Sequence, residues 1–318
     1  MTKTLLVGGA GFIGSNIARE LLEKEEEVVI FDPLIQYVNP FEADYSTLIN
    51  KRFEGIVDKV TIERADARYL REVYRILEKH KPDYIIHLAG MPISTISNVL
   101  IDEAIESTVT STTNLLEAIK DVGFVKRFIY TSSSMVYGDF QYTPADENHP
   151  KNPKDIYGAS KLAGEIFTQA YGKRFDLEYT IIRPSAVYGP TDMNKRVSQI
   201  FVENALKGEE LILKGSDTKL DFTHVKDAAH GFVLATFSEN AKNEVFNITS
   251  GNAKSLKELA EIVKELVPDV KIREEPLDKS MPERGTLDIS KARKLLGFEP
   301  QYDLNEGIRE YIKFLEKK

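Results

Sequence analysis

Tyr157 and Lys161, four residues apart, form the pair in this sequence best suited to acid–base chemistry. Four residues make about one helical turn, so both side chains would lie on one helix face with the ammonium beneath the phenol. A free tyrosine titrates at about 10, and lowering that pKa by roughly three units takes about 4 kcal/mol. A neighbouring ammonium and a second positive charge could supply this energy. Tyr157 would then act as a general base near neutral pH.

A run of three serines lies upstream of this pair, in TSSSMVYG at 131–138. A hydroxyl beside the phenol could hydrogen-bond a substrate oxygen and share in the proton transfer. Because Ser132, Ser133 and Ser134 are adjacent, spacing alone does not say which of them faces the substrate. The serine run and the loop described next argue against a merely packed tyrosine and a solvated lysine.

The chain opens with a glycine-rich loop, GGAGFIG, which follows a strand pattern and begins a helical one. This is the context that a dinucleotide-binding loop requires. Its three spaced glycines would allow a tight turn, close approach to a pyrophosphate and close packing of helix on sheet, with the helix N-terminus facing the anion. The residues of this loop that we assign to the cofactor are Gly8, Gly11, Phe12, Ile13 and Gly14.

An aspartate, Asp32, ends the second strand pattern. A carboxylate at that place accepts hydrogen bonds from the ribose hydroxyls of a dinucleotide and repels a 2′-phosphate. The sequence therefore predicts NAD rather than NADP as the cofactor. Two further strand ends supply the other predicted contacts to NAD, where Asp66 could meet the adenine edge: Asp66, Ala67, Leu88 and Ala89.

Short apolar runs alternate with longer helical patterns along much of the chain. The runs are rich in β-branched residues without strict alternation, as expected for strands buried on both faces of a parallel sheet. Strands are predicted at residues 4–9, 27–32, 60–66, 84–90, 127–133, 179–185 and 245–250. Helices are predicted at residues 12–24, 69–80, 100–121, 155–173 and 196–207. Repeated strand–helix units indicate an α/β protein with a doubly wound parallel sheet, the Rossmann class.

Regularity falls after about residue 183, where RPSAVYGP brings two prolines and short helices mix with irregular stretches. We expect an NAD-binding Rossmann domain at residues 1–182, to which later strands near 221–250 return. Residues 183–318 should form mainly a smaller C-terminal substrate-binding lobe. This lobe should close over the crevice at the carboxyl ends of the strands, where ligands bind in such folds.

Composition narrows the possible roles of the protein. The 318 residues carry a formal net charge of −8 without a basic stripe, which disfavours a nucleic-acid partner. No apolar run approaches a membrane span and nothing reads as a signal peptide, so a cytoplasmic protein is expected. Cysteine is absent and the five histidines show no paired spacing, which predicts no metal site. Charged residues make up 29%, a composition that resembles those of thermophilic proteins.

Together the motifs resemble those of the extended short-chain dehydrogenases/reductases, in particular the NAD-dependent nucleotide-sugar epimerase/dehydratase family. The resemblance runs from end to end and keeps the family's order of motifs. It rests on GGAGFIG (8–14), Asp32, HLAG (87–90), SSSMVYG (132–138), YGASK (157–161), RPSAVYGP (183–190), DFTHVKDAA (221–229) and DISKARKLLGFEP (288–300). The resemblance implies a bound NAD, a catalytic Tyr–Lys pair, a Rossmann lobe with a small substrate lobe, and a homodimer formed through two helices.

The resemblance assigns catalytic roles to Ser133, Tyr157 and Lys161. Ser133 corresponds to the family's catalytic Ser or Thr when the sequences are aligned on the following VYG. Sugar 4,6-dehydratases carry an acidic pair directly after that residue, whereas this chain has Ser134 and Met135, which cannot transfer the proton. Decarboxylases of UDP-glucuronate usually carry Glu where Met135 stands. The run therefore looks most like that of UDP-glucose and UDP-glucuronate 4-epimerases.

The chain also departs from the family pattern. Its N-x-x-G-T helix motif has lost its Asn and Gly, a second Asn is replaced, and an Arg that contacts the nucleotide is missing. The residues found at these places are Thr108, Ser111, Ala186 and Leu220. Replacements for the lost cation are Lys219, Arg196 and Arg284, and Arg196 is preferred because a guanidinium opening a helix could take a pyrophosphate bidentately. The residues assigned to the substrate are Ser133, Ser134, Tyr157, Ala186, Arg196 and Arg284.

These features predict an NAD-dependent epimerase of a nucleotide sugar that acts at C4 through a transient 4-keto sugar. Tyr157 would take the 4-hydroxyl proton, Ser133 would hydrogen-bond the same oxygen, and Lys161 would hold the ribose hydroxyls and keep the phenolate charged. A dehydrogenase or reductase that releases its keto product shares the hydride step and stays open. A non-catalytic NAD-binding sensor is the alternative from another class, and the intact catalytic residues argue against it.

A homodimer is expected on the residues as well as on the resemblance. The predicted helices 100–121 and 155–173 carry apolar residues beyond the face that covers the sheet, for example Leu162 and Ile166. A two-fold dimer that packs these helices against their copies would bury such residues.

Overall fold

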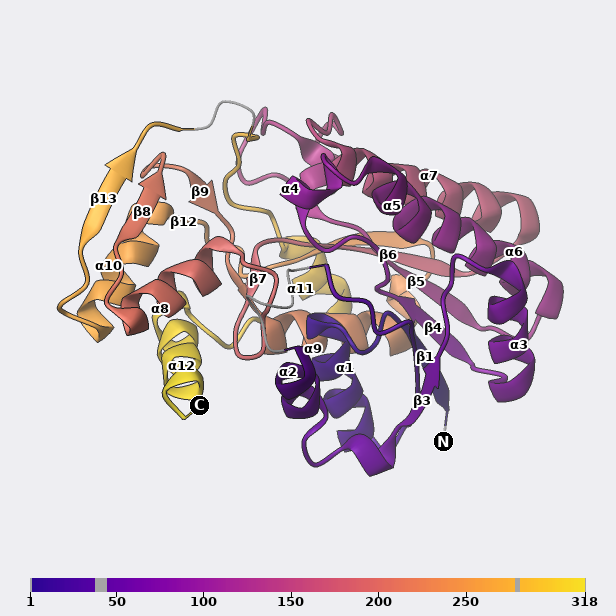
Figure 1. The fold of residues 1–318 in the computed structure, drawn as a ribbon. Coiled ribbons are helices and arrows are strands. Elements are labelled where there is room, and N and C mark those ends of the chain that lie inside the picture. The colour runs from indigo at the N-terminus through magenta and orange to yellow at the C-terminus, as the bar shows by residue number, and fades with distance from the viewer. Residues whose placement is uncertain (1, 38–44, 278–280, 318) are drawn as a thin grey trace.

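The computed structural model describes residues 2–37, 45–277 and 281–317, and a seven-stranded sheet forms its centre (Figure 1). The strands lie in the order β11-β6-β5-β4-β1-β2-β3, and every pairing in this sheet is parallel. The strands are β1 (Lys3–Val7), β2 (Glu27–Asp32), β3 (Thr61–Arg64), β4 (Tyr84–His87), β5 (Arg127–Thr131), β6 (Tyr179–Pro184) and β11 (Glu244–Ile248). Each predicted strand is present, and the doubly wound parallel sheet is confirmed.

Helices cover both faces of this sheet, because parallel strands need crossover connections that pack back onto it. Successive residues of β2 alternate between the two resulting layers, with Val28 and Ile30 in one and Val29 and Phe31 in the other. One face carries α1 (Phe12–Glu23), α2 (Tyr45–Phe53), α9 (Val225–Phe237) and α11 (Ser290–Leu296). The other carries α3 (Leu70–His80), α6 (Ser111–Val122) and α7 (Ile156–Phe175) (Figure 1).

The strand order reverses between β1 and β4, which are neighbours in the sheet. Connections leave these two strands in opposite directions, so a crevice opens at their carboxyl ends. The glycine loop follows β1, and the HLAG segment ends β4 and continues beyond it. Both segments therefore border the crevice, which is where the sequence analysis placed the cofactor.

The C-terminal lobe, at the left of Figure 1, has an apolar core of its own. Its helices are α8 (Val197–Lys207), α10 (Leu256–Leu266) and α12 (Leu304–Glu316). Its two-stranded pairings are β8 (Leu211–Lys214) with β13 (Ile272–Glu275), β7 (Val187–Tyr188) with β10 (Thr223–His224), and β9 (Lys219–Leu220) with β12 (Lys254–Ser255). Between its visits to this lobe the chain returns to the central sheet through α9 and β11.

One long predicted helix, residues 100–121, is interrupted. It consists of α5 (Ile101–Ile105), a π-helical turn at Glu106–Thr110 and then α6. Side-chain hydroxyls here compete with backbone N–H groups for the helix carbonyls. The Ser111 hydroxyl, for example, donates to the Ser107 carbonyl at 2.6 Å. Such π turns are frequent at functional sites. The remaining short helices and turns are α4 (Ser94–Ser97) and the 3₁₀ turns Val57–Lys59, Ser134–Tyr137 and Glu239–Ala241.

The two apolar residues that illustrated the expected dimer face lie in different surroundings. Leu162 is partly buried and packs against the cluster of Val136, Tyr137 and Leu287. Ile166, one turn later on α7, is 57% exposed. Ile166 is therefore the more accessible of the two residues for the predicted dimer contact.

The helices after residue 207 were missed or were predicted only as short helices without bounds. α9 is apolar on most sides because it packs between the sheet and α1, so it has no polar face to show helical periodicity. α10 carried a readable signal, a capping box in which Ser255 and Glu258 satisfy each other's backbone groups. Among the described helices, none is both long and apolar enough to cross a bilayer.

Candidate active site

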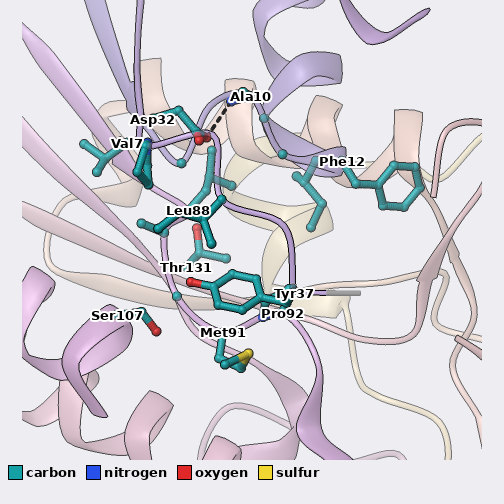
Figure 2. A pocket seen from close by; sticks show the side chains of 18 of the residues that line it. Val7, Ala10, Phe12, Asp32, Tyr37, Leu88, Met91, Pro92, Ser107 and Thr131 are labelled. Carbon is teal, nitrogen blue, oxygen red and sulfur yellow. Dashed lines mark hydrogen bonds between the residues drawn. The ribbon is translucent and has the colours of Figure 1, made fainter. Parts of the chain in front are cut away.

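The glycine loop lies between the carboxyl ends of β1 and β4 and leads into α1 (Figure 2). Gly8 has a φ of +78°, and a Cβ there would lie 2.6 Å from the Ala89 nitrogen, so only glycine fits. At Gly14 a Cβ would lie 2.7 Å from the Gly9 Cα, because helix and loop touch. At Gly11 it would meet only the Gly8 carbonyl, at 3.1 Å, on the side of the crevice. The loop is thus a cradle at a helix N-terminus with room for a phosphate.

Asp32 is fixed beside this loop (Figure 2). Its Oδ2 accepts from the Ala10 N–H at 3.0 Å and its Oδ1 from the Leu34 N–H at 2.7 Å. Burial raises the pKa of this carboxyl, and the two backbone N–H groups and the Arg52 guanidinium oppose the rise. Each oxygen keeps lone-pair capacity for a ribose hydroxyl, as the assignment to NAD requires.

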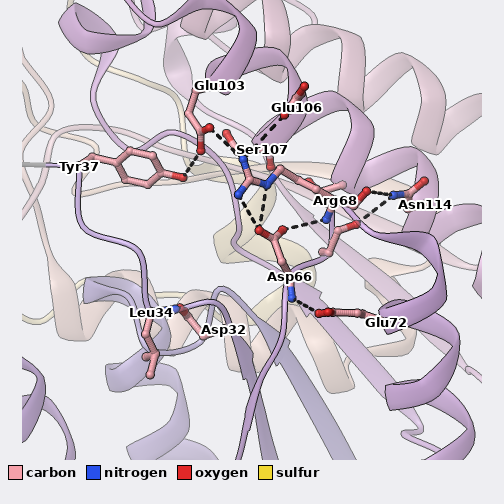
Figure 3. A network of polar contacts seen from close by, with 12 residues as sticks. Asp32, Leu34, Tyr37, Asp66, Arg68, Glu72, Glu103, Glu106, Ser107 and Asn114 are labelled. Atoms are coloured by element: carbon pink, nitrogen blue, oxygen red, sulfur yellow. Dashed lines mark hydrogen bonds and ion pairs between the residues drawn. The ribbon is translucent and has the colours of Figure 1, made fainter.

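Asp66 also borders the crevice, but its carboxylate is held by Arg68 (Figure 3). Oδ2 accepts from Arg68 Nε at 2.9 Å and Nη2 at 2.7 Å, and Oδ1 accepts from the Arg68 backbone N–H at 2.9 Å. Asn114 of α6 donates to the carbonyls of Ala67 and Arg68 at 3.1 and 2.8 Å. The segment expected to meet the adenine is therefore a rigid turn with an arginine that the sequence analysis did not assign.

A single crevice collects every residue predicted for the cofactor. The predicted residues that line it are Gly8, Gly11, Phe12, Ile13, Gly14, Asp32, Asp66, Ala67, Leu88, Ala89, Tyr157 and Lys161. Further lining residues that the sequence analysis missed include Tyr37, Arg52, Arg68, Ser107 and Thr131. These come from five separate segments that only the folded sheet brings together, and no local spacing marks them.

The residues that are present fit NAD. Thr131 Oγ1 is buried on the wall of the crevice and finds no hydrogen-bond partner among the described residues. An unsatisfied buried hydroxyl is costly, so it favours a ligand with polar groups at that place. The glycine cradle accepts a pyrophosphate, and Asp32 accepts ribose hydroxyls.

Tyr157 and Lys161 lie one turn apart near the start of α7, with Lys161 Nζ 6.0 Å from the centre of the Tyr157 ring. The first turn of α7 is capped by Asp155, whose carboxylate accepts from the Gly158 N–H at 2.7 Å. Lys161 Nζ donates to the Thr131 carbonyl at 2.9 Å. Burial lowers the pKa of Lys161 to about 8. The pair is thus held at the wall of the crevice in the predicted arrangement.

The electrostatics at Tyr157 differ from the simple expectation. Burial raises the pKa of its phenol, while the Ser133 hydroxyl and the guanidinium groups of Arg196 and Arg284 act in the opposite direction. Lys161 is not among the main influences on this pKa. A positive charge on a bound cofactor would favour the phenolate, and this is the second positive charge expected beside Lys161.

The three serines have three different environments. Ser132 turns into the core, where its hydroxyl donates to the Glu165 carboxylate. Ser133 Oγ accepts from the Met135 N–H at 3.2 Å, and its hydroxyl lies close enough to the Tyr157 phenol to lower the pKa of that group. Ser134 Oγ is buried and unpartnered among the described residues. The serine that faces Tyr157 is therefore Ser133.

The three candidate cations for the substrate's phosphates have different environments. Arg196, at the N-cap of α8, donates from Nη1 to Asp192 Oδ1 at 2.8 Å and from Nη2 to the Pro92 carbonyl at 3.3 Å. Arg284 has a buried Nε without a partner among the described residues, and burial lowers its pKa to about 10. Lys219 points to solvent. Among the described residues the Arg284 Nε has no hydrogen-bond partner, whereas the Arg196 guanidinium is already paired with Asp192.

Ala186 and Leu220, the departures expected near the substrate, both belong to the core of the C-terminal lobe. Ala186 has a φ of +37°, a conformation that suits the Asn of the family better than Ala. Neither side chain lines the cofactor crevice. The geometry therefore gives Ala186 a packing role and leaves its predicted substrate contact without support.

Residues 4–249 match the NAD dependent epimerase/dehydratase family. The chain belongs to this family. UDP-glucose 4-epimerase of Mycolicibacterium smegmatis is 33% identical over 326 residues, which cover 99% of each chain. UDP-glucuronic acid decarboxylase 3 of Arabidopsis thaliana is 33% identical over 319 residues, which cover 96% of this chain and 86% of that one.

The family's solved structures agree with the fold described above. UDP-glucuronic acid 4-epimerase from Bacillus cereus, solved in complex with UDP-glucuronic acid and NAD, has a TM-score of 0.90. It is 25% identical in sequence, and 99% of each chain is covered. Membership of the NAD dependent epimerase/dehydratase family confirms the resemblance and the predicted cofactor. Because relatives include both 4-epimerases and decarboxylases, the reaction of this family member has to be argued from its own site.

Proposed function

We propose that this protein is an NAD-dependent epimerase that inverts C4 of a nucleoside-diphosphate sugar. One observation carries the proposal: the Ser133 hydroxyl lies beside the Tyr157 phenol, and Tyr157 and Lys161 both line the NAD crevice. Two hydroxyls facing one another can share a single substrate oxygen. Bound NAD⁺ would accept and return a hydride, and its cationic ring would favour the phenolate.

The side chains then have separate tasks in the reaction. Tyr157 takes the proton of the sugar 4-hydroxyl, and Ser133 donates a hydrogen bond to the same oxygen as it becomes a carbonyl. Lys161, anchored on the Thr131 carbonyl, holds ribose hydroxyls and the phenolate charge. After the 4-keto sugar has turned in the pocket and received the hydride on its other face, Tyr157 returns the proton. The protein and its cofactor end as they began.

The residues after Ser133 disfavour two related reactions. Ser134 and Met135 are both buried, and neither has a group that could protonate a leaving hydroxide in a dehydration. Met135 also stands where decarboxylases usually carry Glu. A net dehydrogenase or reductase that releases a keto sugar shares the hydride step and is the second candidate.

For the diphosphate of the substrate, we propose Arg284 rather than the initially preferred Arg196. An anion at Arg284 would meet a guanidinium whose buried Nε has no partner among the described residues, whereas an anion at Arg196 must compete with Asp192. Arg284 also lies within electrostatic reach of Tyr157, so a phosphate there would leave the attached sugar near the phenol.

The proposal is tested with a panel of UDP-, GDP-, dTDP- and CDP-hexoses and UDP-glucuronic acid, followed by NMR. Inversion at C4 without NADH accumulation, lost in Tyr157→Phe, is the expected result. Accumulating NADH with a released keto sugar would establish the dehydrogenase instead. Release of carbon dioxide from UDP-glucuronic acid as the only reaction would establish a decarboxylase.

A further inference from the structure

A chain of polar contacts ties the loop after β2 across the adenosine end of the crevice (Figure 3). The Tyr37 hydroxyl donates to Glu103 Oε1 at 3.1 Å. Glu103 Oε2 accepts from Arg68 Nη1 at 2.8 Å, and Arg68 Nε and Nη2 donate to Asp66 Oδ2. Tyr37, Asp66 and Arg68 all line the crevice. A side chain from one wall is therefore fastened to the opposite wall.

The residues that make these polar contacts come from separate parts of the sequence. The Tyr37–Glu103 contact therefore closes a ring made of these side chains and the backbone that carries them. Tyr37 follows β2, Arg68 follows β3 and Glu103 lies on α5. The loop is also anchored at its start, because the Leu34 N–H donates to Asp32 at 2.7 Å and Leu34 has a φ of +57°. The carboxylate that anchors the loop is the same one that is placed to receive the ribose.

The contacts of this ring differ in strength. The side chains of Arg68 and Glu103 are 19% and 28% exposed, so water can replace their contacts and the pair is weaker than a buried one. Glu103 lies on a helix of only five residues that continues into the π turn. By contrast, Asn114 holds the Arg68 carbonyl rigidly at 2.8 Å. The weak point of the ring is therefore Glu103, which both Tyr37 and Arg68 contact.

We propose that Tyr37, Glu103 and Arg68 form a clasp that retains NAD in the protein between turnovers. The adenosine half of NAD would lie inside the ring and could leave only after the Tyr37–Glu103 hydrogen bond breaks. The value of such retention rests on the proposed function, because an epimerase regenerates its cofactor in place and has no reason to release it. Burial and the Glu103 carboxylate raise the pKa of Tyr37, which keeps its hydroxyl a hydrogen-bond donor.

The clasp is tested by the rate at which the full-length protein releases NADH. The protein is loaded with NADH, mixed with an excess of NAD⁺, and followed by nucleotide fluorescence in the absence of any sugar. Tyr37→Phe and Glu103→Ala should each release NADH about tenfold faster, a loss of about 1.4 kcal/mol. The double variant should be no faster than either single one, because one ring is broken in each case. Tyr69→Phe, which changes an exposed tyrosine outside the crevice lining, is the matched control and should match the wild type.

The outcomes separate this inference from the proposed function. Release from Tyr37→Phe at the wild-type rate overturns the clasp, whatever the epimerase assay shows. Additive effects of the two substitutions overturn the closed ring as well. Faster release from both single variants, in a protein that inverts no nucleotide sugar, supports the clasp and removes the epimerase. Circular dichroism shows whether each variant is folded, and Glu103→Ala tests the ring from its other side.

Discussion

Glu165 and Arg183 form a bidentate ion pair in the core immediately behind the serine turn. Arg183 Nε and Nη2 donate to the two Glu165 oxygens at 2.8 and 2.7 Å, and both side chains are 2% exposed. The Ser132 hydroxyl donates to the same carboxylate, and Arg183 Nη1 donates to the Tyr137 hydroxyl at 2.9 Å. Ser132 and Tyr137 flank the turn that presents Ser133. The ion pair therefore fixes both ends of that turn.

This arrangement predicts different consequences for neighbouring serines. Ser133→Ala should lower kcat at least about a hundredfold, because the hydroxyl facing Tyr157 is lost. Ser132→Ala should instead destabilise the protein by about 1–3 kcal/mol, since Glu165 loses a buried donor. Chemical denaturation and steady-state kinetics of the two variants check both statements. A larger loss of kcat in Ser132→Ala than in Ser133→Ala would place the catalytic hydroxyl one residue earlier.

The parts of the site that could be predicted from sequence are those with a local geometry. The Tyr157–Lys161 spacing and the glycine loop each act within a few residues, so the pattern itself contains the geometry. The strands were predictable for the same reason, because each is a short apolar run between turn signals. Contacts between segments that are distant in the sequence could not be predicted, because only the folded protein brings them together. That Tyr37 meets Glu103, or that Arg196 reaches the Pro92 carbonyl, depends on how distant segments are folded together.

Cofactor choice should follow from Asp32. Its carboxylate lies where a ribose hydroxyl binds, and a 2′-phosphate there would meet a negative charge. We expect wild-type protein to bind NAD(H) at least tenfold tighter than NADP(H), a difference of about 1.4 kcal/mol. Asp32→Ala should reduce this preference mainly by admitting NADP. Calorimetric titration of both proteins with both nucleotides measures the difference, and equal affinities in the wild type would contradict the assignment.

His87, buried beneath Lys161, should make the protein sensitive to acid. Burial and the nearby ammonium lower the pKa of this imidazole to about 3, from an ordinary value of about 6.5. Below about pH 6.5, His87 is therefore protonated in the unfolded chain but stays neutral in the native state. Stability is unaffected above that pH and falls as the pH drops, by about 3 kcal/mol at about pH 4.

The comparison variant for this acid effect is His87→Asn, which does not titrate but can still contact Thr112. In the wild type His87 Nε2 lies 3.0 Å from the Thr112 hydroxyl. Denaturant unfolding of both proteins at about pH 7 and about pH 4 gives the change in free energy. The wild type should lose about 3 kcal/mol more than the variant. Parallel losses in the two proteins would mean that His87 is protonated in the native state.

Assembly is predicted from Ile166. We propose a two-fold dimer in which α5 and α7, which pack together, meet their copies through exposed Ile101, Ile105 and Ile166. Ile166→Glu would bury a charge in that interface and should give monomers in light scattering at micromolar concentration. Ile212→Glu changes a partly exposed isoleucine on β8 of the other lobe and should leave the dimer intact. A wild-type protein that is already monomeric at this concentration would exclude the arrangement.

Binding of the substrate's diphosphate should depend on Arg284 more than on Arg196. Arg284 is partly buried, its Nε has no partner among the described residues, and burial lowers its pKa, so binding an anion there relieves an unfavourable charge. Losing a charge-assisted contact costs about 1.5–3 kcal/mol, and Arg284→Met should therefore raise the KM for the nucleotide sugar about ten- to a hundredfold. The kcat should change little, because the phosphate contact is the same in ground and transition states.

Arg196→Met is the matched comparison for this last prediction. Its guanidinium is already neutralised by Asp192, so its removal should raise KM less than removal of Arg284 does. It should also destabilise the protein, because Asp192 is buried and would lose its ion-pair partner. Kinetics of both variants against one accepted nucleotide sugar decide between the two arginines. A larger rise in KM for Arg196→Met would mean that substrate displaces Asp192 from Arg196, which restores the assignment first made from the helix position.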